Sequence, residues 1–149
     1  MKSYSQALKI LKKGKISFGN EIIKTSSCLD RICAINIFSP TYYPAANNSA
    51  FDGFALNSKD TKNLSIKKGK LFKIIGSIAA GNKPRNLKNK KFQTFEIMTG
   101  GLLPKNFDTI LPKENIKSYV IKKKIKYILI NQKFSKNKNI RLKGSDYKK

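Results

Sequence analysis

The chain has 149 residues, enough for one ordinary domain or two small ones, and its formal net charge is +24, from 32 lysines and arginines against 8 acids. Its two cysteines are too few for a disulfide framework, and without histidine a four-ligand Cys/His zinc site cannot be built. No apolar run approaches the ~20 residues that cross a bilayer, and the lysine-rich start lacks the apolar core of a secretory signal. We therefore expect a cytoplasmic protein with no membrane association.

The positive charge suggests nucleic-acid binding, but its composition argues against specific recognition. Only Arg31, Arg85 and Arg141 are arginines; the other cations are lysines, spread over the whole chain among many asparagines and isoleucines. A/T-rich codons explain this composition without any partner. A protein that reads bases is expected to use arginine forks and stacking aromatics. A non-specific nucleic-acid binder, held by charge alone, stays open as one alternative.

The first predicted element is a short helix near the amino terminus. Ser3 and Gln6 have the spacing of a capping box, and Gly14 is placed to end the helix. Four apolar side chains fall on one helical face: Tyr4, Ala7, Leu8 and Leu11. Further on, "CLDRICAINIFSP" (residues 28–40) starts with helical spacing, then alternates up to a proline. This pattern predicts a helical turn or two that passes into an extended segment.

The second half of the chain predicts short strands separated by Gly, Pro, Asn and Lys. The predicted strands are residues 71–78, 92–98, 107–111, 118–121 and 125–130. The lysines between the last two indicate a hairpin turn. We therefore expect an α+β protein in which short N-terminal helices precede a strand-dominated domain, either barrel-like or a small sheet. Residues 1–40 would form a helical and extended linker or dimerisation segment, 41–139 the β-rich domain, and 140–149 a return segment toward the first domain.

The stretch "NNSAFDGFA" (residues 47–55) contains one acid and no lysine, which is unusual in so basic a chain. An Asp-Gly pair between small and aromatic residues is a strong signal for a tight turn between strands. Alternatively, Asp52 is presented at the tip of the turn beside Ser49, and Gly53 lets a ligand approach the backbone. The sequence leaves both interpretations open.

The stretch "EIMTGGLLP" (residues 96–104) runs a predicted strand into Thr99-Gly100-Gly101. A hydroxyl and freely turning backbone amides can converge on an oxyanion, as in phosphate-binding glycine turns. A plain connection between strands is the alternative.

Four further residues have ordinary structural interpretations. Asp108 and Glu114 border a short apolar strand in a lysine-rich region, which favours surface ion pairs. Cys28 and Cys33 are expected to behave as small buried hydrophobic residues.

Four stretches, taken in order, carry a further signal: "SP…YPAANNSAFDGFAL", "AAG", "EIMTGGLLPKNFDTILPKE" and "NIRLKGSD". Their order and spacing resemble the N-terminal half of the molybdopterin molybdenumtransferase family, the enzymes related to the C-terminal domain of gephyrin. Four residues depart from that family's pattern: Phe51, Phe54, Gly101 and Ser145 stand where methionine, tyrosine, alanine and glutamate are usual. The change at Ser145 removes one carboxylate from a possible metal or substrate contact.

The resemblance implies insertion of molybdenum from molybdate into adenylylated molybdopterin, with release of AMP and with a magnesium ion assisting. Asp52, Thr99 and Asp146 match motif residues of the family and are the expected catalytic residues. Asp52 and Asp146 are also the expected metal ligands. The expected substrate-binding residues are Ser49, Gly53 and Gly100. A lysine-free surrounding suits Asp52 because no ammonium group then competes with the metal for its oxygens.

The resemblance also implies that part of the enzyme is absent. Family members continue through an α/β domain that holds the pterin nucleotide and a small β domain, and neither is present in this sequence. We therefore expect an N-terminal fragment or split subunit that forms a homodimer, takes a small anionic substrate and is inactive alone, its C-terminal half being encoded separately or missing. A non-enzymatic dimerisation or interaction module of the same fold is a further alternative.

Overall fold

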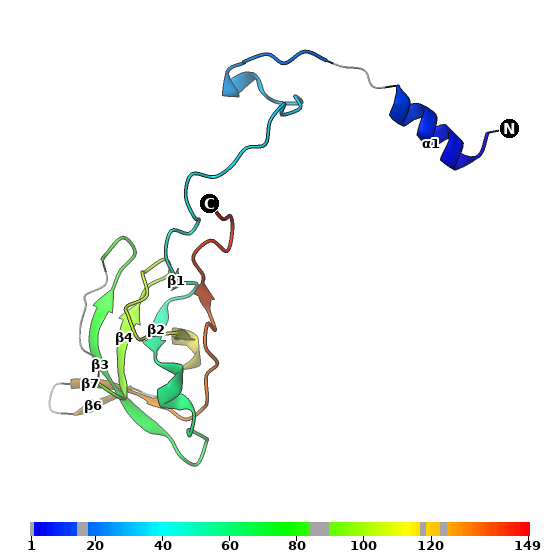
Figure 1. Ribbon diagram of the computed structural model, residues 1–149. Coiled ribbons are helices and arrows are strands. Elements are labelled where there is room, and N and C mark those ends of the chain that lie inside the picture. Colours follow the sequence, from blue (N-terminus) through cyan, green and yellow to red (C-terminus); the bar gives the residue numbers. More distant parts are fainter. Residues whose placement is uncertain (1, 15–17, 84–89, 117–118, 123–124) are drawn as a thin grey trace. The chain divides into compact units, whose positions relative to one another are not determined.

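The computed structural model describes residues 2–14, 18–83, 90–116, 119–122 and 125–149. The chain forms two compact units, Met1–Ile37 and Phe38–Lys149, and each is considered by itself. Figure 1 shows the ribbon of both. The predicted three-part division of the chain stays a prediction. Within the described residues, no helix is long and apolar enough to span a membrane.

The helix predicted near the amino terminus is confirmed as α1 (Tyr4–Lys13). The Ser3 hydroxyl accepts a hydrogen bond from the Gln6 amide at 3.4 Å, and the Gln6 side chain accepts one from the Ser3 amide at 2.9 Å. This reciprocal capping box satisfies donors that a helix start leaves free. At the other end, the Gly14 amide donates to the Ile10 carbonyl. No residue of α1 is buried.

The prediction for residues 28–40 is not confirmed. The structure has a single short 3₁₀ turn, η1 (Thr25–Ser27), followed by a tight turn in which the Arg31 amide donates to the Cys28 carbonyl at 3.1 Å. Leu29 and Ile32 are 83% and 96% exposed. Short helices in proteins gain most of their stability by packing an apolar face, and these side chains have no surface to pack on within their unit.

The prediction for the two cysteines is wrong, since Cys28 and Cys33 are both exposed. Cysteine is often buried as a small hydrophobic residue. The loop that carries these two encloses no core, so the side chains stay at the surface.

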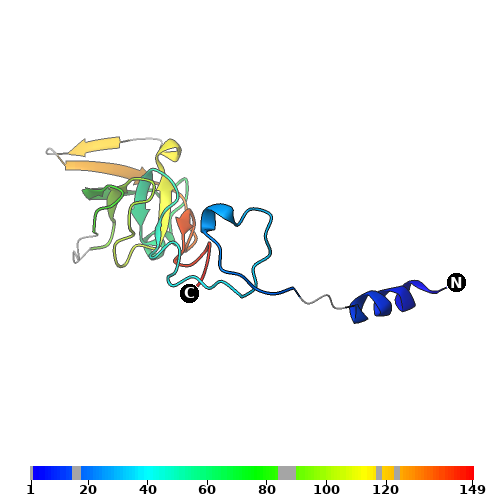
Figure 2. The same cartoon turned by 90° about the horizontal axis from the view of Figure 1, so that it is seen from above.

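The second unit is dominated by strands, which confirms the strand-dominated part of the predicted fold (Figures 1 and 2). Its larger sheet contains β2 (Gly53–Leu56), β3 (Lys70–Ile78), β4 (Gln93–Ile97), β5 (Thr109–Pro112), β6 (Tyr119–Lys122) and β7 (Ile125–Ile130). The strand order is β5-β2-β4-β3-β7-β6, and the β3–β4 pair alone is parallel. All five predicted strands are present, and β6 and β7 form the predicted hairpin. Of the lysines predicted at its turn, residues 122–124, Lys122 ends β6, and residues 123 and 124 lie outside the described residues.

A second, two-stranded sheet joins β1 (Asn48–Ser49) to β8 (Ile140–Arg141). Two short 3₁₀ turns, η2 (Ser58–Thr61) and η3 (Lys113–Asn115), follow β2 and β5. The two outermost strands of the larger sheet, β5 and β6, do not pair with each other among the described residues. The sheet is therefore open, and the barrel-like alternative is not confirmed.

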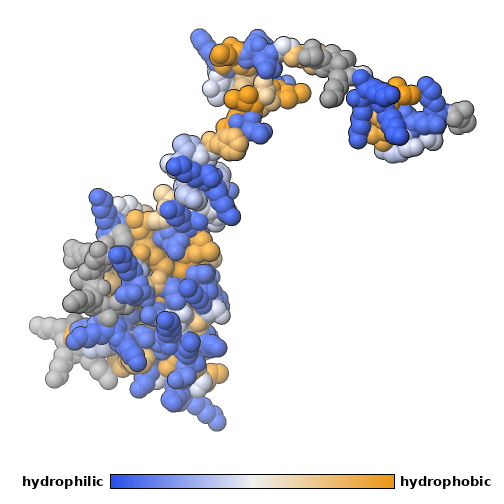
Figure 3. Space-filling model, viewed as in Figure 1, coloured by the Kyte–Doolittle hydropathy of each residue, from blue (hydrophilic) through white to orange (hydrophobic). Residues whose placement is uncertain are grey.

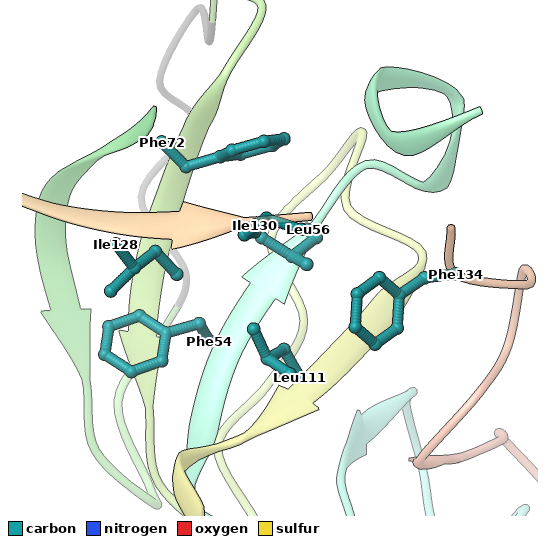
Figure 4. Close-up of a cluster of buried hydrophobic side chains, with 7 residues drawn as sticks. All are labelled: Phe54, Leu56, Phe72, Leu111, Ile128, Ile130 and Phe134. Carbon is teal, nitrogen blue, oxygen red and sulfur yellow. The ribbon is translucent and has the colours of Figure 1, made fainter. Parts of the chain in front are cut away.

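Strand β2 is the centre of the hydrophobic core. Phe54, Ala55 and Leu56 are all fully buried, and alternate side chains of a strand point to opposite faces of the sheet. One face packs into the cluster of Figure 4, whose members are Phe54, Leu56, Phe72, Leu111, Ile128, Ile130 and Phe134. Ala55 packs into a second cluster with residues such as Ile97 and Ile110. Lysine is thus excluded from this part of the chain because both faces of the strand are buried.

The ion pair predicted for Asp108 is wrong, and the one predicted for Glu114 is not confirmed. The two Asp108 carboxylate oxygens accept hydrogen bonds from the Ser58 amide at 2.7 Å and the Ser58 hydroxyl at 2.9 Å. Both donors belong to η2, so the carboxylate fixes this turn to the start of β5. Glu114 is exposed, and no ion pair joins it to the rest of the described chain.

Candidate functional site

Backbone hydrogen bonds join the two motif stretches into one structure. The Ser49 amide donates to the Gly101 carbonyl at 2.9 Å, and the Gly100 amide donates to the Ser49 carbonyl at 2.8 Å. Ser49 is fully buried, and its hydroxyl donates to the Phe51 carbonyl at 2.6 Å. Ser49 therefore shapes the bend from within, and its side chain has no solvent-facing surface for a ligand.

Asp52 lies in the bend between β1 and β2, and its side chain is exposed. The Thr99 amide and the Thr99 hydroxyl both donate to the same oxygen, Oδ1, each at 2.7 Å. Among the described residues, no hydrogen bond or ion pair involves the other oxygen, Oδ2. The bend does not close a hairpin, because β1 and β2 belong to different sheets. One carboxylate oxygen is thus fixed in place, while the other faces solvent.

Thr99 also stabilises the ionised form of Asp52. The hydrogen bond from the Thr99 amide, and after it the one from the Thr99 hydroxyl, lower the pKa of Asp52 below its usual value. Desolvation opposes this shift, and the charge of Lys113 adds to it. The expectation that no lysine lies near Asp52 is therefore wrong, because Lys113 comes close to it in the folded chain. Both donors stabilise the ionised form because they point at the negative oxygen. Thr99 therefore keeps Asp52 ionised to a lower pH than an ordinary aspartate.

The Thr99→Val variant tests how much the Thr99 hydroxyl contributes to the lowered pKa of Asp52. This substitution keeps the side-chain shape and the backbone amide. We expect the pKa of Asp52 to rise part of the way toward its usual value, because one of two donors is lost. The measurement is an NMR titration of the Asp52 carboxyl carbon, with Thr41→Val as the control. An unchanged pKa in Thr99→Val would contradict the role of the hydroxyl.

The pH dependence of stability has a definite sign. Because the pKa of Asp52 is lower in the folded state than in the unfolded state, the contribution to stability is present above the unfolded pKa. It is lost as the pH falls through the folded pKa. Thr99→Val should therefore reduce the loss of folding stability that protonation of Asp52 causes at acid pH.

Two predicted site glycines are required by the backbone. A Cβ atom added at Gly53 would lie 2.1 Å from the Leu111 carbonyl oxygen on the neighbouring strand β5. Gly100 has a φ of +78°, a region that residues with a Cβ atom rarely adopt. These glycines place Asp52 and Thr99 against each other, and their contact with substrate stays a prediction.

Asp146 lies in a different set of contacts. It forms an ion pair with Arg141 at 2.6 Å, and it accepts a hydrogen bond from the Ser145 hydroxyl at 3.0 Å. Its backbone amide donates to the Tyr43 carbonyl. The structure therefore brings together five of the six predicted site residues: Ser49, Asp52, Gly53, Thr99 and Gly100. Among the described residues, Asp146 makes no hydrogen bond or ion pair with any of these five.

Sequence reasoning missed two polar residues beside this site. Arg141 neutralises Asp146, and the spacing of five residues around a glycine turn could have suggested the pair. Asn48 lies in β1 next to Ser49, and its side-chain oxygen is buried without a hydrogen-bond partner among the described residues. No sequence signal distinguished Asn48 from the neighbouring Asn47.

The donor set fits a magnesium ion only in part. Among the described residues, no group of three or more Cys, Asp or Glu side chains could hold a metal. Magnesium in phosphate-handling sites is commonly bound by one or two carboxylates together with substrate phosphates and water. Asp52 fits such a role through its solvent-facing oxygen. Asp146 fits it less well, because Arg141 already occupies one of its oxygens.

Comparisons with known proteins all point to the same family. A family model described as "MoeA N-terminal region (domain I and II)" matches residues 2–149. The molybdopterin molybdenumtransferase of Synechococcus elongatus is 31% identical over 116 residues, which cover 76% of this chain and 29% of that protein. The molybdopterin molybdenumtransferase of Staphylococcus epidermidis is 29% identical over 150 residues, which cover 98% of this chain and 33% of that protein.

A solved structure agrees with this match. A molybdopterin biosynthesis MoeA protein from Pyrococcus horikosii has a TM-score of 0.71 at 31% sequence identity, covering 97% of this chain and 36% of that chain. The chain belongs to the MoeA family and corresponds to its N-terminal region, which confirms the resemblance found in the sequence. It spans 29% and 33% of the length of the two curated relatives named above.

Proposed function

We propose that this chain supplies the N-terminal part of a molybdopterin molybdenumtransferase in molybdenum cofactor biosynthesis. The reaction inserts molybdenum from molybdate into adenylylated molybdopterin and releases AMP. Family membership supports the class of reaction. The single observation that carries the proposal is the Asp52 carboxylate, exposed at the junction of both motifs and held on one oxygen by Thr99.

The proposed role of each residue follows from its contacts. Asp52, held on Oδ1 by Thr99, presents its other oxygen, Oδ2, to a hard cation or to a donor group of the substrate. Thr99 is a positioning residue, because its amide and hydroxyl are both used to hold Asp52. A magnesium ion, when bound, would offset the negative charge of the substrate's diphosphate. Ser49, Gly53 and Gly100 keep the bend and the turn in register.

We also propose that the protein acts in the cytoplasm as a homodimer, with the remainder of the enzyme supplied by further sequence or a separate chain. Large apolar side chains of the first unit support a partner surface there. Tyr4, Leu11 and Phe18 are 84%, 76% and 81% exposed. Isolated apolar residues are common on surfaces, but so many in one small unit favour burial against another chain.

A chimera tests the proposed function. Residues 1–149 of this chain replace the matching N-terminal third of the Staphylococcus epidermidis relative, and AMP release is measured with molybdate and adenylylated molybdopterin. We expect turnover by the chimera and none by the isolated chain, which lacks the nucleotide-holding part implied by the resemblance.

The outcomes separate the alternatives. Turnover by the isolated chain would show that the chain is not an incomplete enzyme. A chimera that folds and dimerises but has no activity would favour a non-enzymatic module of the same fold.

A further inference from the structure

The two cysteines of the chain lie in the same loop of the first unit. Cys28 and Cys33 are the only cysteines in the sequence, and both are free and exposed. Both line one depression of about 550 Å³, which residues 19–23 and 31–35 also border. Figure 3 shows hydrophobic side chains at the surface of this unit. The two thiols therefore face the same space.

A reversal of the chain brings the second cysteine back toward the first. The Arg31 amide donates to the Cys28 carbonyl at 3.1 Å, which closes a turn, and the Cys28 amide donates to the Thr25 carbonyl at 3.2 Å. In an extended chain, five residues would separate the two Cα atoms by roughly 17 Å. A disulfide requires Cα atoms within about 7 Å of each other. The turn shortens the separation in the direction that a disulfide needs.

The loop can complete this approach because no core packs against it. All of residues 18–37 are exposed, and the described buried hydrophobic residues belong to the second unit. An ion pair joins Arg31 to Glu21 and so links the turn to the segment before it. Exposed ion pairs contribute little to stability. A small movement of the turn therefore disrupts no packing, and such segments open at low free-energy cost.

Both thiols are also accessible to dissolved reagents. Exposed cysteines react with small oxidants and disulfides, whereas cysteines buried in a core are inert. Glutathione disulfide is an anion, and the net charge of +24 favours its approach to this chain. In a reducing compartment, the disulfides that form are usually transient and serve catalysis or redox sensing.

We propose that Cys28 and Cys33 form a reversible thiol–disulfide pair that exchanges with low-molecular-weight disulfides. One cysteine thiolate attacks a sulfur of glutathione disulfide, which forms a mixed disulfide and releases one glutathione thiolate. The other cysteine then attacks the protein sulfur of the mixed disulfide. This step forms the Cys28–Cys33 bond and releases the second glutathione. The protein loses two electrons and two thiol protons, and the reagent takes up both to become two molecules of reduced glutathione.

The test is equilibration of the reduced 149-residue chain with oxidised and reduced glutathione, followed by alkylation of the remaining thiols and mass spectrometry. We expect the intramolecular disulfide to exceed the mixed disulfide at least about tenfold at about 0.1 mM reduced glutathione, because a short tether gives the two thiols an effective concentration in the millimolar range. Trypsin cleaves after Arg31, so this disulfide would join two separate peptides, residues 25–31 and 32–59.

The controls separate the pair from a single reactive thiol and from the sequence spacing alone. Cys28→Ser and Cys33→Ser each leave one thiol, so each variant should retain one glutathione and give no linked peptides. Unfolding the unchanged chain in guanidinium chloride keeps the spacing but removes the turn. The ratio of intramolecular to mixed disulfide should then fall by about threefold or more, because the effective concentration depends on the geometry of the tether.

Two results would overturn the proposal. Mixed disulfides or cross-linked dimers in place of the linked peptides would show that the two thiols do not meet within one chain. Equal ratios in the folded and the unfolded chain would show that the spacing, and not the turn, brings them together. Neither measurement depends on molybdenum insertion, so the thiol pair and the proposed function can fail independently.

Discussion

Asp52→Asn is expected to lower turnover by the chimera by about 10²-fold or more, the usual scale for loss of one electrostatic contact in an active site. Asparagine has nearly the same size and can still accept the hydrogen bonds from Thr99. It lacks the negative charge that would hold a cation or orient the substrate. The rate of AMP release at saturating substrate measures this loss, and the thermal midpoint verifies that the variant is folded.

Asp30→Asn is the matched control, because Asp30 is an exposed acid in the first unit, outside the motif junction. Asparagine also tolerates the positive φ of 61° at this position. Turnover should stay within about twofold of the unchanged chimera, as expected for a surface substitution with no named structural role. If Asp52→Asn left turnover equally unchanged, the catalytic role of Asp52 would be wrong.

Gly53→Ala is expected to give the largest loss of stability, about 3 kcal/mol or more in the free energy of unfolding. The added methyl group would lie 2.1 Å from the Leu111 carbonyl oxygen and 2.9 Å from the Pro112 Cα atom. Both are backbone atoms of β5, so β2 and β5 would have to separate. Urea unfolding monitored by circular dichroism measures the change.

Gly76→Ala provides a comparison within the same sheet. There the added methyl group would lie 3.2 Å from the Phe95 ring, and a side chain can shift more easily than a paired strand. We expect a loss of about 1 kcal/mol. Equal losses for the two variants would show that the close approach of β2 to β5 is not what requires Gly53.

Elements that depend on local signals could be predicted from the sequence. The capping residues Ser3 and Gln6 and the final Gly14 define α1, because the groups that begin and end a short helix are close neighbours in the chain. Strands β3 to β7 were predicted for the same reason, from short apolar runs between turn residues. Strands β1, β2 and β8 were not predicted.

The failed predictions concern packing. Over residues 28–40, helical and alternating apolar spacing is present, but the side chains have no surface in their own unit to cover, so neither element forms. Asp108 was expected to meet a lysine because lysines are frequent near it in sequence. It binds Ser58 instead, at a separation of fifty residues that no local pattern encodes.

The candidate site was also predicted in part: the sequence identified its residues, but not the contacts between them. Motif order and spacing identified Asp52, Thr99 and Asp146 as residues of interest. The direct bonds between Asp52 and Thr99, across a separation of 47 residues, depend on how β1, β2 and β4 come together. The same assembly places Arg141 against Asp146, which changes the expected contribution of that acid.

The family, the starting helix and the positions of β3 to β7 could be predicted from the sequence, which also shows the lysine-free stretch around Asp52. The tertiary structure explains the absence of lysine from residues 53–56 alone. Strand β2 is buried on both faces between β4 and β5, so its residues cannot be charged, while the bend just before it reaches solvent. Burial and long-range pairing depend on the whole folded chain, so local composition could not distinguish a packing requirement from a functional one.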